Sequence, residues 1–203
     1  MSHPRNKSVV GPVDWSIIYI WMFFVVVGWI TIYSAAYDAH HPLPFDFSKE
    51  YGKQMMWIGI SSLLAVFTLY VEGDFFAKFA WVIYAFFVLL LALVLVIGKE
   101  VNGAKAWFGI GAFGIQPSEF SKIGVGLVLA KYIASIGNSQ LKNWRSRAIS
   151  AAIIGLPAGL ILLQPDVGSL LTFVAFIFVL YREGLSGNVL IVGFAGILFG
   201  VLS

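Results

Sequence analysis

Runs of apolar residues long enough to cross a lipid bilayer occupy most of this sequence, and they limit its fold more than any other feature. A spanning helix needs about 20 mainly apolar residues. Such runs lie at 15–37, 55–71, 75–97, 117–136, 148–163 and 166–181, with a further run at 188–203. Open sheet edges are not tolerated in lipid, so the runs should be helices. The sequence therefore predicts an all-α, polytopic transmembrane helix bundle with six complete spans and part of a seventh, in a single membrane domain.

The composition agrees with a membrane protein and excludes several other classes. Of 203 residues, 60% are hydrophobic and 11% are charged, whereas a soluble domain has roughly half apolar and a quarter charged residues. The sequence has no cysteine, which rules out disulfides and thiolate metal sites. The net charge is only +3, and the basic residues serve better as topology markers than as a nucleic-acid surface. We therefore expect a protein surrounded by membrane lipid, with no nucleic-acid partner.

The positions of lysine and arginine predict the orientation of the chain, because positively charged loops tend to remain in the cytoplasm. With a cytoplasmic N-terminus, the outer loops would hold only Lys49, Lys53, Lys99 and Lys105. The inner segments would hold Arg5, Lys7, Lys78, Lys131, Lys142, Arg145, Arg147 and Arg182. This bias predicts a cytoplasmic N-terminus, so that the runs beginning at 117 and 166 both start on the outer side.

Two short motifs, QPSE at 116–119 and QPDV at 164–167, stand at the outer ends of these two runs. Each carries a carboxylate, Glu119 or Asp166, at or within an apolar run, whereas we expect the other acidic residues to lie in loops or tails. An ionisable group inside a span is costly enough to indicate function. The alternative is that both motifs are ordinary helix starts, since proline suits the first helical position and an acid complements the helix dipole.

Lys122 follows Glu119 by three residues, which places the two on one helix face where they can form an ion pair. Such a pair offsets the desolvation of each partner and could itself be purely structural. Two helix N-termini on the same outer side would also suit an anionic group such as phosphate or pyrophosphate. The charge pattern thus favours an anion site on the outer side of the bundle.

The segment 98–116 before the first motif contains five glycines among apolar residues. It is too rich in glycine to be a span and too apolar to be dissolved in water. We expect a short re-entrant or interfacial segment, with Trp107 at headgroup depth, where it could simply belong to an aromatic belt. Lys105 beside it could neutralise a phosphate or extend its amino group towards the interface.

The stretch NGAKAWFGIGAFGIQPSEFSKI, taken together with LLQPDVGSLLTF, resembles the SEDS family of peptidoglycan polymerases (shape, elongation, division and sporulation). The first external loop is more similar to the elongation-type members, which act in cell shape, than to the division-type ones. The resemblance implies ten spans in the cytoplasmic (inner) membrane. It also implies a glycosyltransferase that polymerises lipid II at the outer face, releasing undecaprenyl pyrophosphate, with a class B penicillin-binding protein as its partner. Many relatives have an arginine before the tryptophan, where this sequence has GAKAWF.

The resemblance also assigns residues to the substrate cavity. In the family, the Glu and Lys of the first motif and the Asp of the second line a central external cavity, and here these are Glu119, Lys122 and Asp166. We expect their neighbours in the motifs to contribute as well, namely Gln116, Ser118, Gln164, Lys105 and Trp107. Asp166 could bind a divalent cation, Mg²⁺ or Mn²⁺, and no organic cofactor is expected. The catalytic aspartate of the family is expected beyond Ser203, so the 203 residues should form the first half of the family fold and be inactive alone.

Two other functions would explain the same features. A flippase or transporter of lipid-linked precursors would also place ion-paired charges and helix N-termini at a cavity. A membrane scaffold that docks a transpeptidase would use close-packing glycines, with Gly124 and Gly126 or Gly155 and Gly159 as candidates. Ordinary packing within the bundle is the simpler interpretation of each glycine pair.

Overall fold

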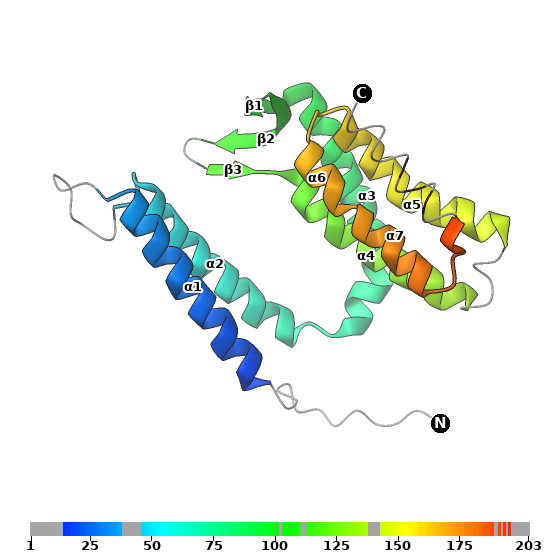
Figure 1. Cartoon of the computed structure of the whole chain (residues 1–203), viewed down its shortest axis with the longest axis horizontal. Coiled ribbons are helices and arrows are strands. Elements are labelled where there is room, and N and C mark those ends of the chain that lie inside the picture. The colour runs from blue at the N-terminus through cyan, green and yellow to red at the C-terminus, as the bar shows by residue number, and fades with distance from the viewer. Residues whose placement is uncertain are drawn as a thin grey trace. The chain divides into compact units, whose positions relative to one another are not determined.

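The computed structural model describes residues 14–37, 46–101, 103–110, 113–137 and 143–188, together with 191, 193 and 195. The chain divides into two compact units, residues 1–72 and 73–203, which are described separately. Both consist mainly of helices, as Figure 1 shows. Four of the described helices, α1, α2, α3 and α5, are long and apolar enough to cross a membrane. The expected class, an α-helical polytopic membrane protein, is thereby confirmed.

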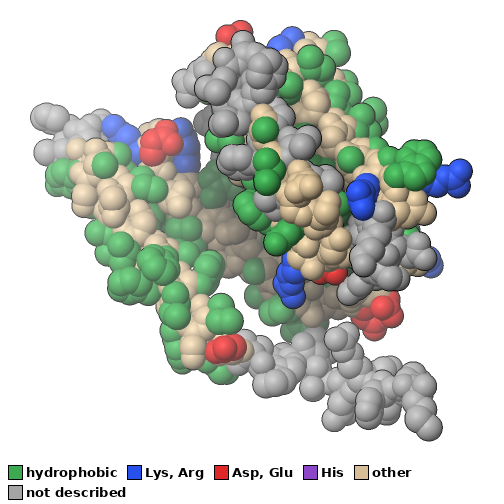
Figure 2. Space-filling view, turned by 45° about the vertical axis from the view of Figure 1, so that its right-hand side comes forward, with side chains coloured by type: hydrophobic (Ala, Val, Ile, Leu, Met, Phe, Trp, Pro, Cys, Tyr) green, Lys and Arg blue, Asp and Glu red, His purple; other side chains and the backbone are tan. Residues whose placement is uncertain are grey.

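The first unit is a hairpin of two long helices, α1 (Trp15–Ala35) and α2 (Glu50–Tyr70). The side chain of Asp14 caps α1 by accepting a hydrogen bond from the amide of Ser16. The helices meet where the Trp29 indole donates to the carbonyl of Tyr51 at 3.1 Å, and the rings of Tyr33 and Tyr51 lie 5.0 Å apart. Hydrophobic side chains cover the visible face of the hairpin, with charged groups at its ends (Figure 2). This apolar outer surface suits a hairpin in lipid.

Among the described residues, the bounded helices of the second unit are α3 (Gly73–Ile97), α4 (Pro117–Ile136), α5 (Trp144–Leu162), α6 (Val167–Thr172) and α7 (Val174–Arg182). The helices at two of the expected runs, 148–163 and 166–181, differ from the prediction. Helix α5 begins four residues earlier than 148, because Asn143 caps it by accepting from the amide of Arg145. The run at 166–181 is two helices interrupted at Phe173, although no proline or glycine marks the break. Most of the run at 188–203 lies outside the described residues.

Two acidic residues that we expected in loops lie in helices instead. Helices α2 and α3 begin earlier than the apolar runs do, so that Glu50 and Asp74 stand in their first turns. A carboxylate in the first turn complements the partial positive charge of the helix N-terminus. This favourable position explains why each helix extends beyond its apolar run.

The core of the second unit lies among α3, α4, α5 and the α6–α7 pair. Helix α4 approaches α3 closely at Gly124, where an added Cβ would lie 3.1 Å from the Cα of Tyr84. Gly155 and Gly159 on α5 have nothing within 4 Å of an added Cβ in the described part of the chain. Close packing therefore uses Gly124 and does not use the GxxxG pair. The buried hydrophobic residues include Ala80, Tyr84, Leu91, Val125, Val128, Leu129, Ile153, Ile161 and Phe173.

A proline within α5 leaves one backbone carbonyl without its helical donor. Pro157 has no N–H, so the carbonyl of Ile153, four residues earlier, cannot form its usual helical hydrogen bond. The hydroxyl of Tyr84 on α3 donates to this carbonyl at 3.0 Å in the buried core. The hydrogen bond that the proline removes from α5 is thus replaced by one from a side chain of α3, which links the two helices.

The segment that we expected to be re-entrant or interfacial contains antiparallel strands. These are β1 (Lys99–Val101), β2 (Ala104–Ile110) and β3 (Phe113–Ile115), in the order β1-β2-β3. Trp107 pairs with Lys99, and Gly109 pairs with Gly114. Only Gln116 separates the end of β3 from the start of α4. The sheet therefore leads directly into the helix that carries the first motif.

Candidate functional site

Asp166 caps the short helix α6. Its Oδ1 accepts a hydrogen bond from the backbone amide of Ser169 at 3.1 Å. Aspartate is favoured at this position because its carboxylate satisfies an amide that the first turn leaves unpaired. QPDV is therefore a helix start, although Pro165 precedes the capping residue and does not occupy the first helical position. The cap does not account for the other oxygen of Asp166.

That second oxygen joins the two motifs. The side-chain amide of Gln116 donates to Asp166 Oδ2 at 2.6 Å, and the Ser118 hydroxyl donates to the same oxygen at 3.4 Å. Ser169 completes the group, with its Oγ 3.0 Å from Ser118 Oγ and 3.3 Å from Gln116 Nε2. We call Gln116, Ser118, Asp166 and Ser169 the QP cluster. It brings the starts of α4 and α6 together across about 50 residues of sequence.

Ser169 belongs to the QP cluster, although it lies outside both sequence motifs. Serine is common in helices and carries no functional signal by itself. The spacing from Asp166 offered a clue, because an N-terminal cap commonly bonds the amide three residues later. Its side-chain contact with the first motif could not be predicted without knowing how α4 and α6 pack.

The expected ion pair between Glu119 and Lys122 is present. Lys122 Nζ lies 2.8 Å from both carboxylate oxygens of Glu119. The lysine side chain is 25% exposed and the glutamate side chain 54% exposed, so the pair reaches the surface of the unit. Glu119 follows Ser118 in the chain, so the ion pair stands on α4 next to a member of the partly buried QP cluster. An amino group at this position can approach a ligand that reaches the start of α4.

Gln164 is buried in the turn before α6. Its side-chain amide donates to the carbonyl of Leu91 on α3 at 3.1 Å. Its Oε1 has no hydrogen-bond partner among the described residues. The side chain thus links the α5–α6 turn to α3 and does not join the hydrogen bonds of the QP cluster.

Lys105 and Trp107 lie on β2, and their described contacts are local. Lys105 Nζ donates to the carbonyl of Val96 at 2.9 Å, where it satisfies one of the last carbonyls of α3. The Trp107 ring lies over Gly114, whose added Cβ would come within 2.9 Å of it. In the described part of the chain, no hydrogen bond connects either side chain to Asp166 or to the Glu119–Lys122 pair. Neither side chain is therefore a member of the hydrogen-bonded QP cluster, and their place in a substrate cavity stays a prediction.

The expected anion site needs revision at the start of α6. One amide of its first turn, that of Ser169, already donates to Asp166. The carboxylate of Asp166 also occupies the position at the helix start where an anion would bind. On the described part of α4, the Lys122 amino group is a positive charge available to an anion, supported by the first turn of the helix.

The described residues do not assemble a cation site around Asp166. Divalent magnesium prefers octahedral oxygen ligands, often two carboxylates. Both oxygens of Asp166 already accept hydrogen bonds from protein groups, and the described part of the chain has no cluster of three or more His, Cys, Asp or Glu side chains. A divalent cation at this place therefore stays a prediction. The described residues would supply one carboxylate ligand, that of Asp166.

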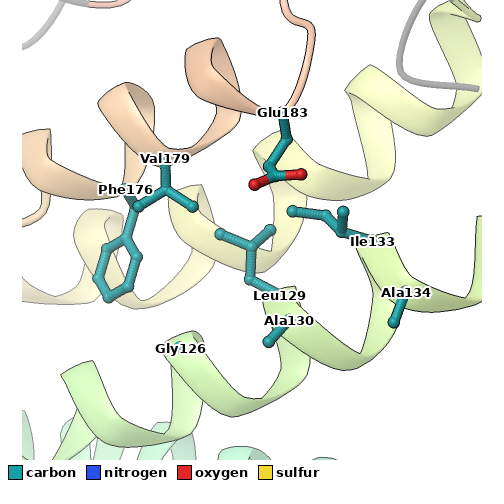
Figure 3. A pocket seen from close by; sticks show the side chains of 8 residues that line it. All are labelled: Gly126, Leu129, Ala130, Ile133, Ala134, Phe176, Val179 and Glu183. Carbon is teal, nitrogen blue, oxygen red and sulfur yellow. The ribbon is translucent and has the colours of Figure 1, made fainter. Parts of the chain in front are cut away.

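A groove of about 440 Å³ lies between α4 and α7. Its lining is apolar except for Glu183, which follows α7, as Figure 3 shows. The lining residues are Gly126, Leu129, Ala130, Ile133, Ala134, Phe176, Val179 and Glu183. None of the predicted site residues is among them, so the groove is distinct from the QP cluster.

The fold and the site define a class: a helical membrane protein in which a partly buried polar cluster joins two helix starts next to a surface ion pair. A family model described as "Cell cycle protein", for FtsW, RodA and SpoVE, matches residues 14–202. The chain therefore belongs to the FtsW/RodA/SpoVE family, which confirms the resemblance to the SEDS proteins.

Two curated relatives illustrate the similarity. The chain is 35% identical to the peptidoglycan glycosyltransferase RodA of Treponema pallidum over 161 residues, which cover 79% of this chain and 36% of that protein. It is 28% identical to a probable peptidoglycan glycosyltransferase FtsW of Escherichia coli O6:H1 over 186 residues, which cover 89% of this chain and 44% of that protein. The chain thus spans less than half the length of these relatives.

Solved structures agree with the family and the fold. The rod shape determining protein RodA of Thermus thermophilus superposes with a TM-score of 0.78 at 31% identity, over 92% of this chain and 58% of that one. A chain from a peptidoglycan synthase complex, described in terms of polymerization and crosslinking, superposes with a TM-score of 0.75 at 32% identity. That match covers 91% of this chain and 52% of the other.

Proposed function

We propose that this chain forms part of a peptidoglycan glycosyltransferase that polymerises lipid II into glycan strands during cell elongation. The reaction would take place at the outer face of the cytoplasmic membrane, where the start of α4 would lie if the N-terminus is cytoplasmic. Family membership supports the reaction class. The higher identity to a RodA than to an FtsW supports the elongation role and a role in cell shape.

The observation that carries the proposal is the surface ion pair beside the QP cluster. Transfer of a glycan from lipid II releases a pyrophosphate, whose growing negative charge needs a positive group nearby. Lys122 supplies an amino group there, and Glu119 holds it through contacts of 2.8 Å to both carboxylate oxygens. A pyrophosphate that approaches the start of α4 would exchange with Glu119 for the hydrogen bonds of Lys122.

The remaining requirement of the reaction is a base for the acceptor hydroxyl, which must lose a proton. Asp166 is poorly arranged for this task, because both of its oxygens accept hydrogen bonds from the protein. We assign the base to residues beyond Ser203, as the family resemblance implies. The 203 residues would then supply one wall of the substrate cavity and would not polymerise lipid II by themselves.

A partner transpeptidase of the class B penicillin-binding type is part of the proposal. Its support is the structural similarity to a chain from a complex described by polymerization and crosslinking. The partner would crosslink the strands that the glycosyltransferase makes. Co-purification with a penicillin-binding protein from the same membrane would support this assignment.

A polymerisation assay in detergent tests the proposed function. The whole glycosyltransferase of which this chain forms part, purified with its partner, should convert labelled lipid II into glycan strands. Lys122→Met should lower the rate of polymerisation at least tenfold. Lys131→Met is a matched control, because Lys131 lies at the other end of α4 and contacts the carbonyl of Lys78 at 3.4 Å. Without a sealed membrane, polymer can only come from an enzyme, so this assay also separates a polymerase from a flippase.

Two results would contradict the proposal. Normal polymerisation by Lys122→Met would show that its charge is not used in the reaction. Glycan strands made by the 203 residues alone would show that the base lies within them.

A further inference from the structure

Ser169 occupies the centre of the QP cluster. Its side chain is buried, with 5% of the residue exposed. Its hydroxyl contacts Ser118 and Gln116, both on the α4 side, while its backbone amide donates to Asp166 on its own side. Ser169 therefore links the two helix starts through its side chain, while its backbone amide holds Asp166 on its own side.

One arrangement of protons satisfies every contact of the cluster. The Ser169 hydroxyl donates to Ser118 Oγ, and the Ser118 hydroxyl donates to Asp166 Oδ2. Asp166 Oδ1 accepts from the Ser169 amide, which closes a ring of hydrogen bonds. The two N–H bonds of the Gln116 amide then point to Asp166 Oδ2 and Ser169 Oγ. Closed networks of this kind strengthen each member, because each bond polarises the next.

We infer that Ser169 is a positioning residue, which acts on the reaction through the ring and not by touching substrate. The ring holds the first turn of α4 against the start of α6. That same first turn carries Glu119, and the next turn carries Lys122. The direction in which the Lys122 amino group points therefore depends on the Ser169 hydroxyl. The effect on catalysis rests on the proposed function, whereas the ring itself does not.

The burial of the ring supports this role. Ser118 and Ser169 are both almost fully buried, so removal of the Ser169 hydroxyl leaves the Ser118 hydroxyl without water to replace its partner. A partner without its hydrogen bond would turn or shift to find another one. Since small displacements of a reacting or stabilising group cost large factors in rate, we expect Ser169→Ala to lower kcat by about tenfold.

Kinetics with a conservative variant separate positioning from a merely structural role. In the protein that carries these residues, Ser169→Ala should lower kcat for lipid II with little change in KM, at normal membrane abundance. Ser169→Thr retains the hydroxyl and should restore most of the rate. Ser135→Ala is a matched control, because this exposed serine on α4 bonds only the nearby carbonyl of Tyr132 in the described structure. An unchanged kcat for Ser169→Ala, or a loss of rate that only follows a loss of folded protein, would overturn the inference.

A second experiment tests the ring without any enzymatic activity. The 203 residues contain no cysteine, so Ser118→Cys and Ser169→Cys would introduce the only two thiols among them. The two hydroxyl oxygens lie 3.0 Å apart, and the double variant should therefore form a disulfide on mild oxidation, detectable by mass spectrometry. The single variants are the controls.

The two experiments fail in different ways. Absence of the disulfide would overturn the ring, whatever the activity. If the unaltered protein made no glycan while the disulfide formed, the proposed function would be wrong and the ring would stand as a structural link only. Disulfide formation together with the kcat loss of Ser169→Ala and the rescue by Ser169→Thr would support both.

Discussion

The hydrogen bond from Tyr84 to the carbonyl of Ile153 allows a quantitative test of how α5 tolerates its proline. Tyr84→Phe removes only the hydroxyl, which lies 3.0 Å from a carbonyl that Pro157 leaves without a helical donor. An orphaned buried carbonyl costs about 1–3 kcal/mol in soluble proteins. Measured couplings between membrane helices average about 0.6 kcal/mol and reach about 1.7 kcal/mol. We expect Tyr84→Phe to lower the free energy of unfolding by about 1 kcal/mol.

The cost should disappear when α5 can supply its own donor. In Pro157→Ala the backbone amide of residue 157 can bond the carbonyl of Ile153 in the ordinary helical way. Tyr84→Phe should then cost close to zero, so the double-mutant cycle should show a coupling of about 1 kcal/mol. The cycle also cancels the packing that is lost with the buried Pro157 ring.

Reversible unfolding in mixed detergent and SDS micelles, followed by far-ultraviolet circular dichroism, would measure the four proteins of the cycle. Tyr181→Phe, which removes a hydroxyl from an exposed side chain, should leave the unfolding midpoint unchanged. If Tyr84→Phe cost the same amount in the unaltered protein and in the Pro157→Ala variant, the reasoning would be refuted. The hydroxyl would then contribute through something other than the unpaired carbonyl.

Three further predictions concern α4 and its surroundings. Gly124→Ala should lower the free energy of unfolding by about 1 kcal/mol, because the added Cβ would lie 3.1 Å from the Cα of Tyr84 and this overpacking outweighs the gain in helix propensity. Gly155→Ala is the control: with open space around it, the substitution should leave the thermal unfolding midpoint unchanged or raised. Lys122→Met should change the free energy of unfolding by less than about 1 kcal/mol, since partly exposed ion pairs contribute little. A larger loss of stability in the same unfolding assay would contradict this expectation. The Lys105 amino group donates to the carbonyl of Val96 at the C-terminal end of α3, so Lys105→Met should increase amide hydrogen exchange there. Unchanged exchange would show that this hydrogen bond does not stabilise the helix end.

Local rules predicted part of the site. Pro117 at the first helical position marked the start of α4, and the spacing of Glu119 and Lys122 predicted their ion pair, because both depend on residues close in sequence. The contact between Gln116 and Asp166 depends on how two distant helices pack. Topology could place the motifs on one side of the bundle, but it could not show which atoms meet.

Other features were hidden for identifiable reasons. The strands β2 and β3 could not be predicted, because their glycines interrupt the alternation of polar and apolar residues that identifies a strand. The break at Phe173 lacks the proline or glycine that usually signals one. Tyr84 was indistinguishable from its aromatic neighbours until the structure placed its hydroxyl beside the carbonyl that Pro157 leaves free.

The direct passage from β3 into α4 restricts how the chain can vary in length. With one residue between Ile115 and Pro117, the strand and the helix have almost no slack between them. Each residue added to a helix turns the later residues by about 100° about its axis. An insertion of a single residue between Pro117 and Glu119 would therefore swing Lys122 to another side of α4 or pull the strand out of register. Insertions at this junction should therefore be excluded.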